Sequence, residues 1–186
     1  MLPNFFINFL EGRFLKRCRA LSEYSKVISS ADKGRGVELS EDISEGTLLG
    51  IYPGEHLSLS NFLGKEDFVN KSVKSAYLHS EDRIIDPTDI FGFVKDTPNN
   101  RIALINEPSE NEAVNIIPVS SNKHVWYVAI SDVPAGKQLF TSYGHKYERD
   151  YRTRQIDFTS EQLKCLKQVS LNYCWLRAGL REVLEN

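Results

Sequence analysis

Residues 134–144, Pro-Ala-Gly-Lys-Gln-Leu-Phe-Thr-Ser-Tyr-Gly, are the last of an ordered series of short motifs in this chain. Each motif contains Gly, Pro, Asn or Asp, which also form ordinary turns, so each one alone is a weak signal. Their fixed order along the chain is more informative than any single motif. The earlier members of the series are Lys33–Val37, Asp42–Thr47, Gly50–Glu55, Ile84–Pro87 and Asn99–Asn106.

Length and composition predict one soluble globular domain with an ordinary hydrophobic core. The chain has 186 residues, 41% of them hydrophobic, with 23 Lys+Arg against 25 Asp+Glu. A formal charge of −2 gives no overall attraction to nucleic acid, and the few basic residues of Arg13–Arg19 do not support a claim of such binding. No stretch approaches the roughly 20 apolar residues that cross a bilayer, so we expect no membrane partner.

Several classes of functional site lack their sequence signatures. The three cysteines are too widely spaced for a paired zinc motif, and no two histidines have the i, i+4 spacing of a metal-binding helix, so we expect no metal. Neither a Walker A loop nor a Gly-x-Ser-x-Gly elbow occurs. The Gly34-Arg35-Gly36 turn lacks the third glycine and the helix of a dinucleotide site. Its two glycines still let a backbone approach a ligand closely.

Short β-prone runs separated by turn residues predict a mostly β core. Ser60–Val69 carries apolar residues at a mixed spacing and is expected to be a helix. The predicted strands are 24–29, 37–39, 47–52, 76–79, 83–86, 114–119 and 125–130.

Helical segments are expected at both ends of the chain. Residues 1–21 form an N-terminal extension, which we expect to pack as a helix rather than serve as an organelle-targeting segment. Residues 153–186 predict one long amphipathic helix, because apolar residues from Leu166 to Val183 recur on one face and Thr159 with Gln162 forms a capping box. Residues 22–152 lie between them as the central domain.

Taken together, the motifs over about residues 22–152 resemble the SET domain of protein lysine methyltransferases. The series contains a Gly-x-Gly-Val opening, a Tyr-x-Gly-Glu strand end, an Ile-Asp turn and a closing segment that ends in Tyr-Gly. This resemblance implies a SET fold of several small sheets with a knot-like crossing that brings Asn106 near Tyr143. It also implies methyl transfer to a lysine of a protein substrate, a histone or another basic protein.

The resemblance implies S-adenosylmethionine as the methyl donor, held by the backbone of Lys33, Gly34, Arg35 and Gly36, by Asn106 and by Tyr143. Tyr143 matches the family's catalytic tyrosine, and Tyr52 matches a second channel tyrosine of some members. Tyr77 is a third tyrosine that either lines the channel or belongs to the core. Trp126 is expected to be a core residue.

The chain departs from the family pattern at several positions. Glu107 stands where the family usually has histidine, and Lys137-Gln138 replaces two glutamates. The zinc-binding cysteine-rich segments are missing, so the C-terminal helix is expected to complete the pocket, with Tyr147 and Trp175 as the nearest large aromatic residues. These departures keep an alternative open, namely an inactive SET-fold module that binds peptides or proteins.

The expected substrate is a basic peptide segment. Residues 80–115 hold eight acidic and three basic residues, a local balance of −5, which favours such a partner or forms a solvated acidic face. The few, unpaired cysteines favour a reducing compartment, so we expect an intracellular protein of the cytoplasm or nucleus.

Overall fold

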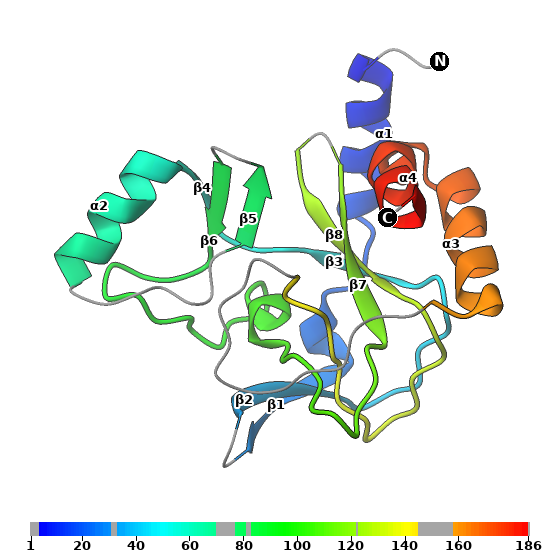
Figure 1. Ribbon diagram of the computed structural model, residues 1–186, viewed down its shortest axis with the longest axis horizontal. Helices are drawn as coiled ribbons and strands as arrows, with labels where there is room; N and C mark the ends of the chain where they lie inside the picture. The colour runs from blue at the N-terminus through cyan, green and yellow to red at the C-terminus, as the bar shows by residue number, and fades with distance from the viewer. Residues whose placement is uncertain are drawn as a thin grey trace.

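Three small antiparallel sheets form the centre of the protein. The computed structural model describes residues 4–30, 33–69, 77–80, 83–121, 123–144 and 158–185. The sheets have the strand orders β1-β2, β3-β8-β7 and β4-β6-β5 (Figure 1). Their strands are β1 (Ser25–Ser30), β2 (Gly34–Leu39), β3 (Leu48–Ile51), β4 (Glu55–Ser58), β5 (Tyr77–Ser80), β6 (Arg83–Asp86), β7 (Ile116–Ser120) and β8 (Val125–Ala129).

Four α-helices lie around these sheets. In Figure 1, α2 lies beside the β4-β6-β5 sheet, and the other three helices lie together at the opposite side. Within the described residues, no helix is long and apolar enough to cross a bilayer. The helices are α1 (Asn4–Leu15), α2 (Leu59–Val69), α3 (Ser160–Asn172) and α4 (Arg177–Glu185), and short 3₁₀ turns occupy η1 (Leu21–Glu23), η2 (Arg101–Leu104) and η3 (Cys174–Leu176).

The predicted mostly β core is confirmed, the helix predicted over residues 60–69 is part of α2, and α1 lies within residues 1–21. Two strand predictions need correction. Glu55–Ser58 forms β4, which the sequence did not indicate because Leu57 is its only apolar residue. Gly34-Arg35-Gly36 is not a turn but the first half of β2, paired with Ile28–Ser30 of β1. The domain boundaries drawn after residues 21 and 152 stay predictions.

A buried carboxylate fixes helix α1 to the β3-β8-β7 sheet, which we call the central sheet. Glu11 is only 2% exposed, and its Oε1 accepts hydrogen bonds from Trp126 Nε1 at 2.7 Å and from Ser121 Oγ at 2.6 Å. Phe14, one turn further along the helix, packs against Trp126, Tyr173 and Trp175. The N-terminal and C-terminal segments therefore share one aromatic cluster.

The C-terminal segment starts as predicted but bends. Thr159 caps α3 by accepting the Gln162 backbone N–H, and its own N–H donates to the Gln162 side chain. The prediction of one long helix is wrong, because α3 ends at Asn172 and α4 runs in another direction after η3 (Figure 1). A Cβ on Gly179 would lie 2.1 Å from the backbone oxygen of Ser120, so α4 lies directly against β7. The bend between α3 and α4 accommodates both this contact and the packing of Tyr173 against Trp175.

The closing motif passes between two earlier segments of the chain, as the expected crossing requires. The Leu139 backbone N–H donates to Val37 of β2, and Thr141 N–H donates to the Asn106 carbonyl at 3.0 Å. On the other side, the Asn115 side chain accepts the Phe140 N–H and donates to the Gln138 carbonyl, both at 2.8 Å. Residues 138–141 are therefore held from both sides.

Two other motifs meet through a glycine. Gly54 has a φ of +131°, and a Cβ there would lie 2.4 Å from the backbone oxygen of Asp86. The Asp86 side chain is buried and accepts hydrogen bonds from Lys65 and Thr88. The turn after Tyr52 can therefore lie against the end of β6 only when residue 54 has no side chain.

We predict that Gly54→Ala lowers the free energy of unfolding by about 2 kcal/mol or more, because a Cβ would both strain the backbone and overlap Asp86. Gly64→Ala is the matched control, since nothing lies within 4 Å of its Cβ position on α2. The control should change stability by no more than about 1 kcal/mol, in the stabilising direction. Urea denaturation measures both, and equal stability of the two variants would contradict the proposed contact.

Candidate active site

A hydrogen-bond donor and an acceptor both lie against Gly36 of β2, which we call the glycine strand. A Cβ on Gly36 would lie 2.8 Å from Asn106 Nδ2 and 2.8 Å from Gln138 Oε1, so only glycine leaves room for both side chains. Both atoms are buried, and neither has a hydrogen-bond partner among the described residues. Native proteins pair nearly all such groups. This pair therefore suits a ligand that offers an acceptor to Asn106 and a donor to Gln138.

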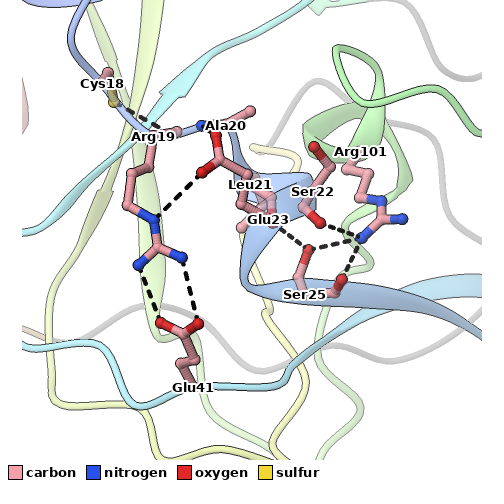
Figure 2. A network of polar contacts seen from close by, with 9 residues as sticks. All are labelled: Cys18, Arg19, Ala20, Leu21, Ser22, Glu23, Ser25, Glu41 and Arg101. Atoms are coloured by element: carbon pink, nitrogen blue, oxygen red, sulfur yellow. Dashed lines mark hydrogen bonds and ion pairs between the residues drawn. The ribbon is translucent and has the colours of Figure 1, made fainter.

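Asn106 is positioned by the 3₁₀ turn that precedes it and by the crossing. Arg101 of η2 donates to the backbone carbonyls of Ser22 and Ser25, which ties η2 to β1 (Figure 2). After η2, Asn106 forms a parallel bridge with Phe140, and its backbone oxygen accepts the Thr141 N–H. The backbone of Asn106 is thus fixed at both of its sides, which leaves the carboxamide as its interacting group.

Tyr143 lies at the end of the same crossing, and hydrogen bonds hold it at two points. Its hydroxyl donates to the Ile105 carbonyl at 3.0 Å, next to Asn106. Its backbone N–H donates to the Glu107 carboxylate at 2.8 Å. The side chain is 38% exposed, so a substrate could reach the ring. The predicted proximity of Asn106 and Tyr143 is therefore seen in the hydrogen bonds of their neighbours.

Four tyrosines gather near this point from separate segments. The ring of Tyr52 lies 5.3 Å from that of Tyr77 and is stacked 6.0 Å from that of Tyr127, measured between centroids. Burial raises the pKa of Tyr127, and the nearby Tyr52, Tyr77 and Tyr143 raise it further. Burial also raises the pKa of Tyr77 to about 12. At neutral pH Tyr77 and Tyr127 are therefore uncharged phenols within an aromatic cluster.

The side chains of Lys33 and Arg35 are engaged within the protein. Lys33 pairs with the Glu112 carboxylate, and its ammonium lies 4.7 Å from the centre of the Phe140 ring. Arg35 donates to the backbone oxygen of Val94 at 2.5 Å. A role of Lys33 and Arg35 in cofactor binding stays a prediction, and their backbone groups rather than their side chains would carry it. The same holds for Gly34, whose φ of +70° is in the region that favours glycine.

Glu112 and Lys33 fix the loop that follows Asn106. Burial acts to raise the pKa of Glu112, whereas hydrogen bonds from Lys33 and Ser109 outweigh it and hold that pKa below its ordinary value. The same Lys33 ammonium donates to the backbone carbonyl of Glu107 at 3.3 Å. One lysine thus connects the start of the glycine strand to the loop over residues 107–112.

The C-terminal helices do not close this site. Trp126 and Tyr127 are neighbours on β8 and therefore face opposite sides of the sheet. Trp126 is fully buried, as predicted, and packs with Trp175, Leu166 and Leu180. The four tyrosines belong to the other side, so the expectation that Trp175 lines the pocket is wrong. Tyr147 lies outside the described residues.

Two residues of this site were not predicted as site residues. Glu107 and Gln138 were noticed only as departures from a family pattern, and nothing local in the sequence shows that they lie against Tyr143 and Gly36.

The described residues contain no group of three or more His, Cys, Asp or Glu side chains that could hold a metal ion. The two cavities near Arg19, of about 580 and 480 Å³, lie outside this site.

Comparison with known proteins agrees with this geometry. A family model of the SET domain matches residues 34–144, which include the glycine strand, Tyr52, Asn106, Gln138 and Tyr143. A search of curated proteins finds no match. The family match covers more than half of the chain and runs from the first glycine of β2 to the end of the crossing. The protein therefore belongs to the SET-domain family, a family of methyltransferases.

Proposed function

We propose that the protein transfers a methyl group from S-adenosylmethionine to a lysine side chain of a protein substrate. SET domains are mostly protein lysine methyltransferases. The observation that carries the proposal is that Asn106 Nδ2 and Gln138 Oε1 lie buried at Gly36 without hydrogen-bond partners among the described residues. The backbone crossing of residues 138–141 connects these side chains to Tyr143. The candidate binding pair and the Tyr143 hydroxyl then lie close together, although they come from separate segments of the chain.

The residues at Gly36 fit the polar end of the cofactor. S-adenosylmethionine carries an amino acid group, whose carboxylate accepts hydrogen bonds and whose ammonium donates them. Asn106 Nδ2 is an available donor and Gln138 Oε1 an available acceptor, and Gly36 keeps a Cβ out of their way. When bound, the cofactor supplies an electrophilic methyl group on a sulfonium.

The cluster of tyrosine rings suits the lysine that receives the methyl group. The attacking amine must be neutral, and deprotonating a free lysine at pH 7 costs about 4.6 kcal/mol for a pKa near 10.4. Tyr52, Tyr77 and Tyr127 form an aromatic cluster, and an amine placed against it would be desolvated, which disfavours the ammonium form. The amine lone pair then forms the new C–N bond, the C–S bond electrons remain on sulfur, and the proton passes to water.

Tyr143 orients the amine rather than deprotonating it. A phenol with a pKa near 10 is a weak base at neutral pH. Its proton donates to the Ile105 carbonyl, and a phenol oxygen is also the kind of acceptor to which the amine can donate a hydrogen bond. The hydroxyl thus contributes by fixing direction and by electrostatics.

An inactive binding module is the second candidate function. The observation in its favour is the substitution pattern, with Glu107 in place of the usual histidine and Lys137-Gln138 in place of two glutamates. Such a module keeps an accessible peptide site and incorporates no methyl groups, so an assay of methyl incorporation separates the two functions.

We also propose that the substrate carries a basic segment around the target lysine and that the protein acts inside the cell, in the cytoplasm or nucleus. Part of the acidic stretch over residues 80–115 is already paired within the chain, which weakens its attraction for a partner. The internal pairs are Asp86–Lys65, Asp89–Lys95, Asp96–Arg101 and Glu112–Lys33. The free thiols of Cys18, Cys165 and Cys174 suit a reducing compartment.

Asn106→Ala should weaken S-adenosylmethionine binding by about 1 to 3 kcal/mol, because it leaves partner groups on the cofactor unpaired. Gly36→Ala should also weaken binding, since its Cβ would displace the Asn106 and Gln138 side chains. Asn61→Ala, an exposed asparagine on α2, is the matched control and should bind like the wild type. Titration calorimetry measures all three, and unchanged affinity of Asn106→Ala would place the cofactor elsewhere.

Tyr143→Phe should retain the fold and most of the cofactor affinity but lose about a hundredfold in turnover, as expected when one preorganised hydroxyl is removed. Tyr173→Phe is the control, because Tyr173 packs in the aromatic cluster on the far side of the sheet. Radiolabelled methyl incorporation into mixed basic proteins compares them. Equal incorporation by Tyr143→Phe and wild type would remove Tyr143 from the mechanism.

Alkaline pH should destabilise the fold through Tyr77. In the unfolded chain a tyrosine ionises near pH 10, whereas the pKa of Tyr77 in the folded protein is about 12. Between these values the folded state binds more protons, so stability falls as the pH rises from 10 to 12. Urea midpoints across this range should fall less steeply for Tyr77→Phe than for the wild type. Identical slopes would mean that Tyr77 ionises normally.

A further inference from the structure

Glu107 is a buried carboxylate placed directly against the backbone of Tyr143. It is 4% exposed, and its Oε1 accepts the Tyr143 N–H at 2.8 Å. A hydrogen bond to an ionised acceptor is about twice as strong as one between neutral groups. Burying a carboxylate is unfavourable unless it is bonded in this way. The side chain is therefore committed to a contact that a residue with a simple packing role would not need.

The position of Glu107 is itself fixed by the surrounding loop. Lys33 donates to the Glu107 backbone carbonyl and pairs with Glu112, whose carboxylate also accepts the Ser109 N–H. Asn106, the preceding residue, is bridged to Phe140. The carboxylate thus extends from an anchored backbone, so it can hold Tyr143 in place rather than follow it.

Tyr143 needs such support because packing encloses its ring only in part. Its side chain is 38% exposed, so packing alone does not specify where the hydroxyl points. One hydrogen bond fixes the backbone through Glu107 and another fixes the hydroxyl through Ile105. With the backbone bond lost, one of the contacts that position the Tyr143 ring is gone, and misplacement by about 1 Å is enough to reduce catalysis strongly.

We propose that Glu107 is a positioning residue for Tyr143: its carboxylate binds the Tyr143 N–H and thereby fixes the direction of the Tyr143 hydroxyl. This inference rests on the proposed methyl transfer. Glu107 acts through Tyr143 and does not touch the reacting atoms. Its replacement of the usual family histidine is then a different way to hold the tyrosine, not a sign of lost activity.

Paired substitutions test this role. Glu107→Gln keeps an oxygen acceptor of the same reach, so its kcat should stay within about threefold of the wild type. Glu107→Ala removes the acceptor, and its kcat should fall by about tenfold to a hundredfold with little change in S-adenosylmethionine affinity. Glu110→Ala, which removes an exposed carboxylate of the same loop, is the control and should leave kcat unchanged.

The decisive comparison repeats Glu107→Ala in a Tyr143→Phe background. If Glu107 acts only through the tyrosine hydroxyl, the second substitution should change kcat by less than about twofold there, since the two effects are coupled. A full additional loss in that background would overturn the proposal. So would equally low kcat for Glu107→Gln and Glu107→Ala, or a parallel loss of cofactor affinity and thermal stability.

A spectroscopic measurement keeps this inference separate from the proposed function. The Tyr143 amide proton, bonded to a carboxylate, should resonate downfield in a ¹⁵N-labelled sample and move upfield further in Glu107→Ala than in Glu107→Gln, which keeps an oxygen acceptor. An unmoved resonance in Glu107→Ala would show that Glu107 does not hold Tyr143. Absence of methyl incorporation by the wild type, with the expected shift present, would instead overturn methyl transfer and with it the catalytic purpose assigned to Glu107.

Discussion

The passage of residues 138–141 between two other segments is the constraint on which the candidate site depends. Backbone hydrogen bonds to β2 hold this segment on one side, and Asn106 and Asn115 hold it on the others. Asn115 uses both the donor and the acceptor of its carboxamide for this purpose. Because Gly36, Asn106 and Tyr143 belong to segments far apart in sequence, this crossing is what brings the unsatisfied Asn106 and Gln138 side chains and the Tyr143 hydroxyl into one region.

The two faces of the β3-β8-β7 sheet carry different sets of side chains. Side chains alternate along β8, so Trp126 and Val128 face the three terminal helices while Tyr127 faces the other tyrosines. Burial of Glu11 against Trp126 and Ser121, and of the Leu166–Leu180 stripe, stabilises the first face. The terminal segments therefore cover the face of the β3-β8-β7 sheet opposite to the one on which Tyr127 lies.

Local patterns in the sequence predicted the local features of this structure. The α3 cap and most strands follow from residues within a few positions of each other, as the Thr159–Gln162 box shows. The bend at Tyr173 was missed because it depends on Gly179 meeting the backbone of β7, a tertiary contact. Family resemblance pointed to Asn106 and Tyr143. The roles of Glu107 and Gln138 could not be predicted, since their partners are distant in sequence and only the crossing brings them into contact.

In the proposed lysine methylation, a buried carboxylate near the target amine raises an electrostatic difficulty. An uncompensated negative charge would favour the ammonium form of the target lysine and so oppose methyl transfer. In this chain one oxygen of Glu107 is bonded to the Tyr143 N–H, whose dipole stabilises the charge locally. The Lys33 ammonium, bonded to the carbonyl of the same residue, brings a positive charge to the loop that also carries Glu112. The Tyr143 N–H therefore helps make an acid at position 107 compatible with a neutral amine, while Lys33, paired with Glu112, fixes the backbone from which that acid extends.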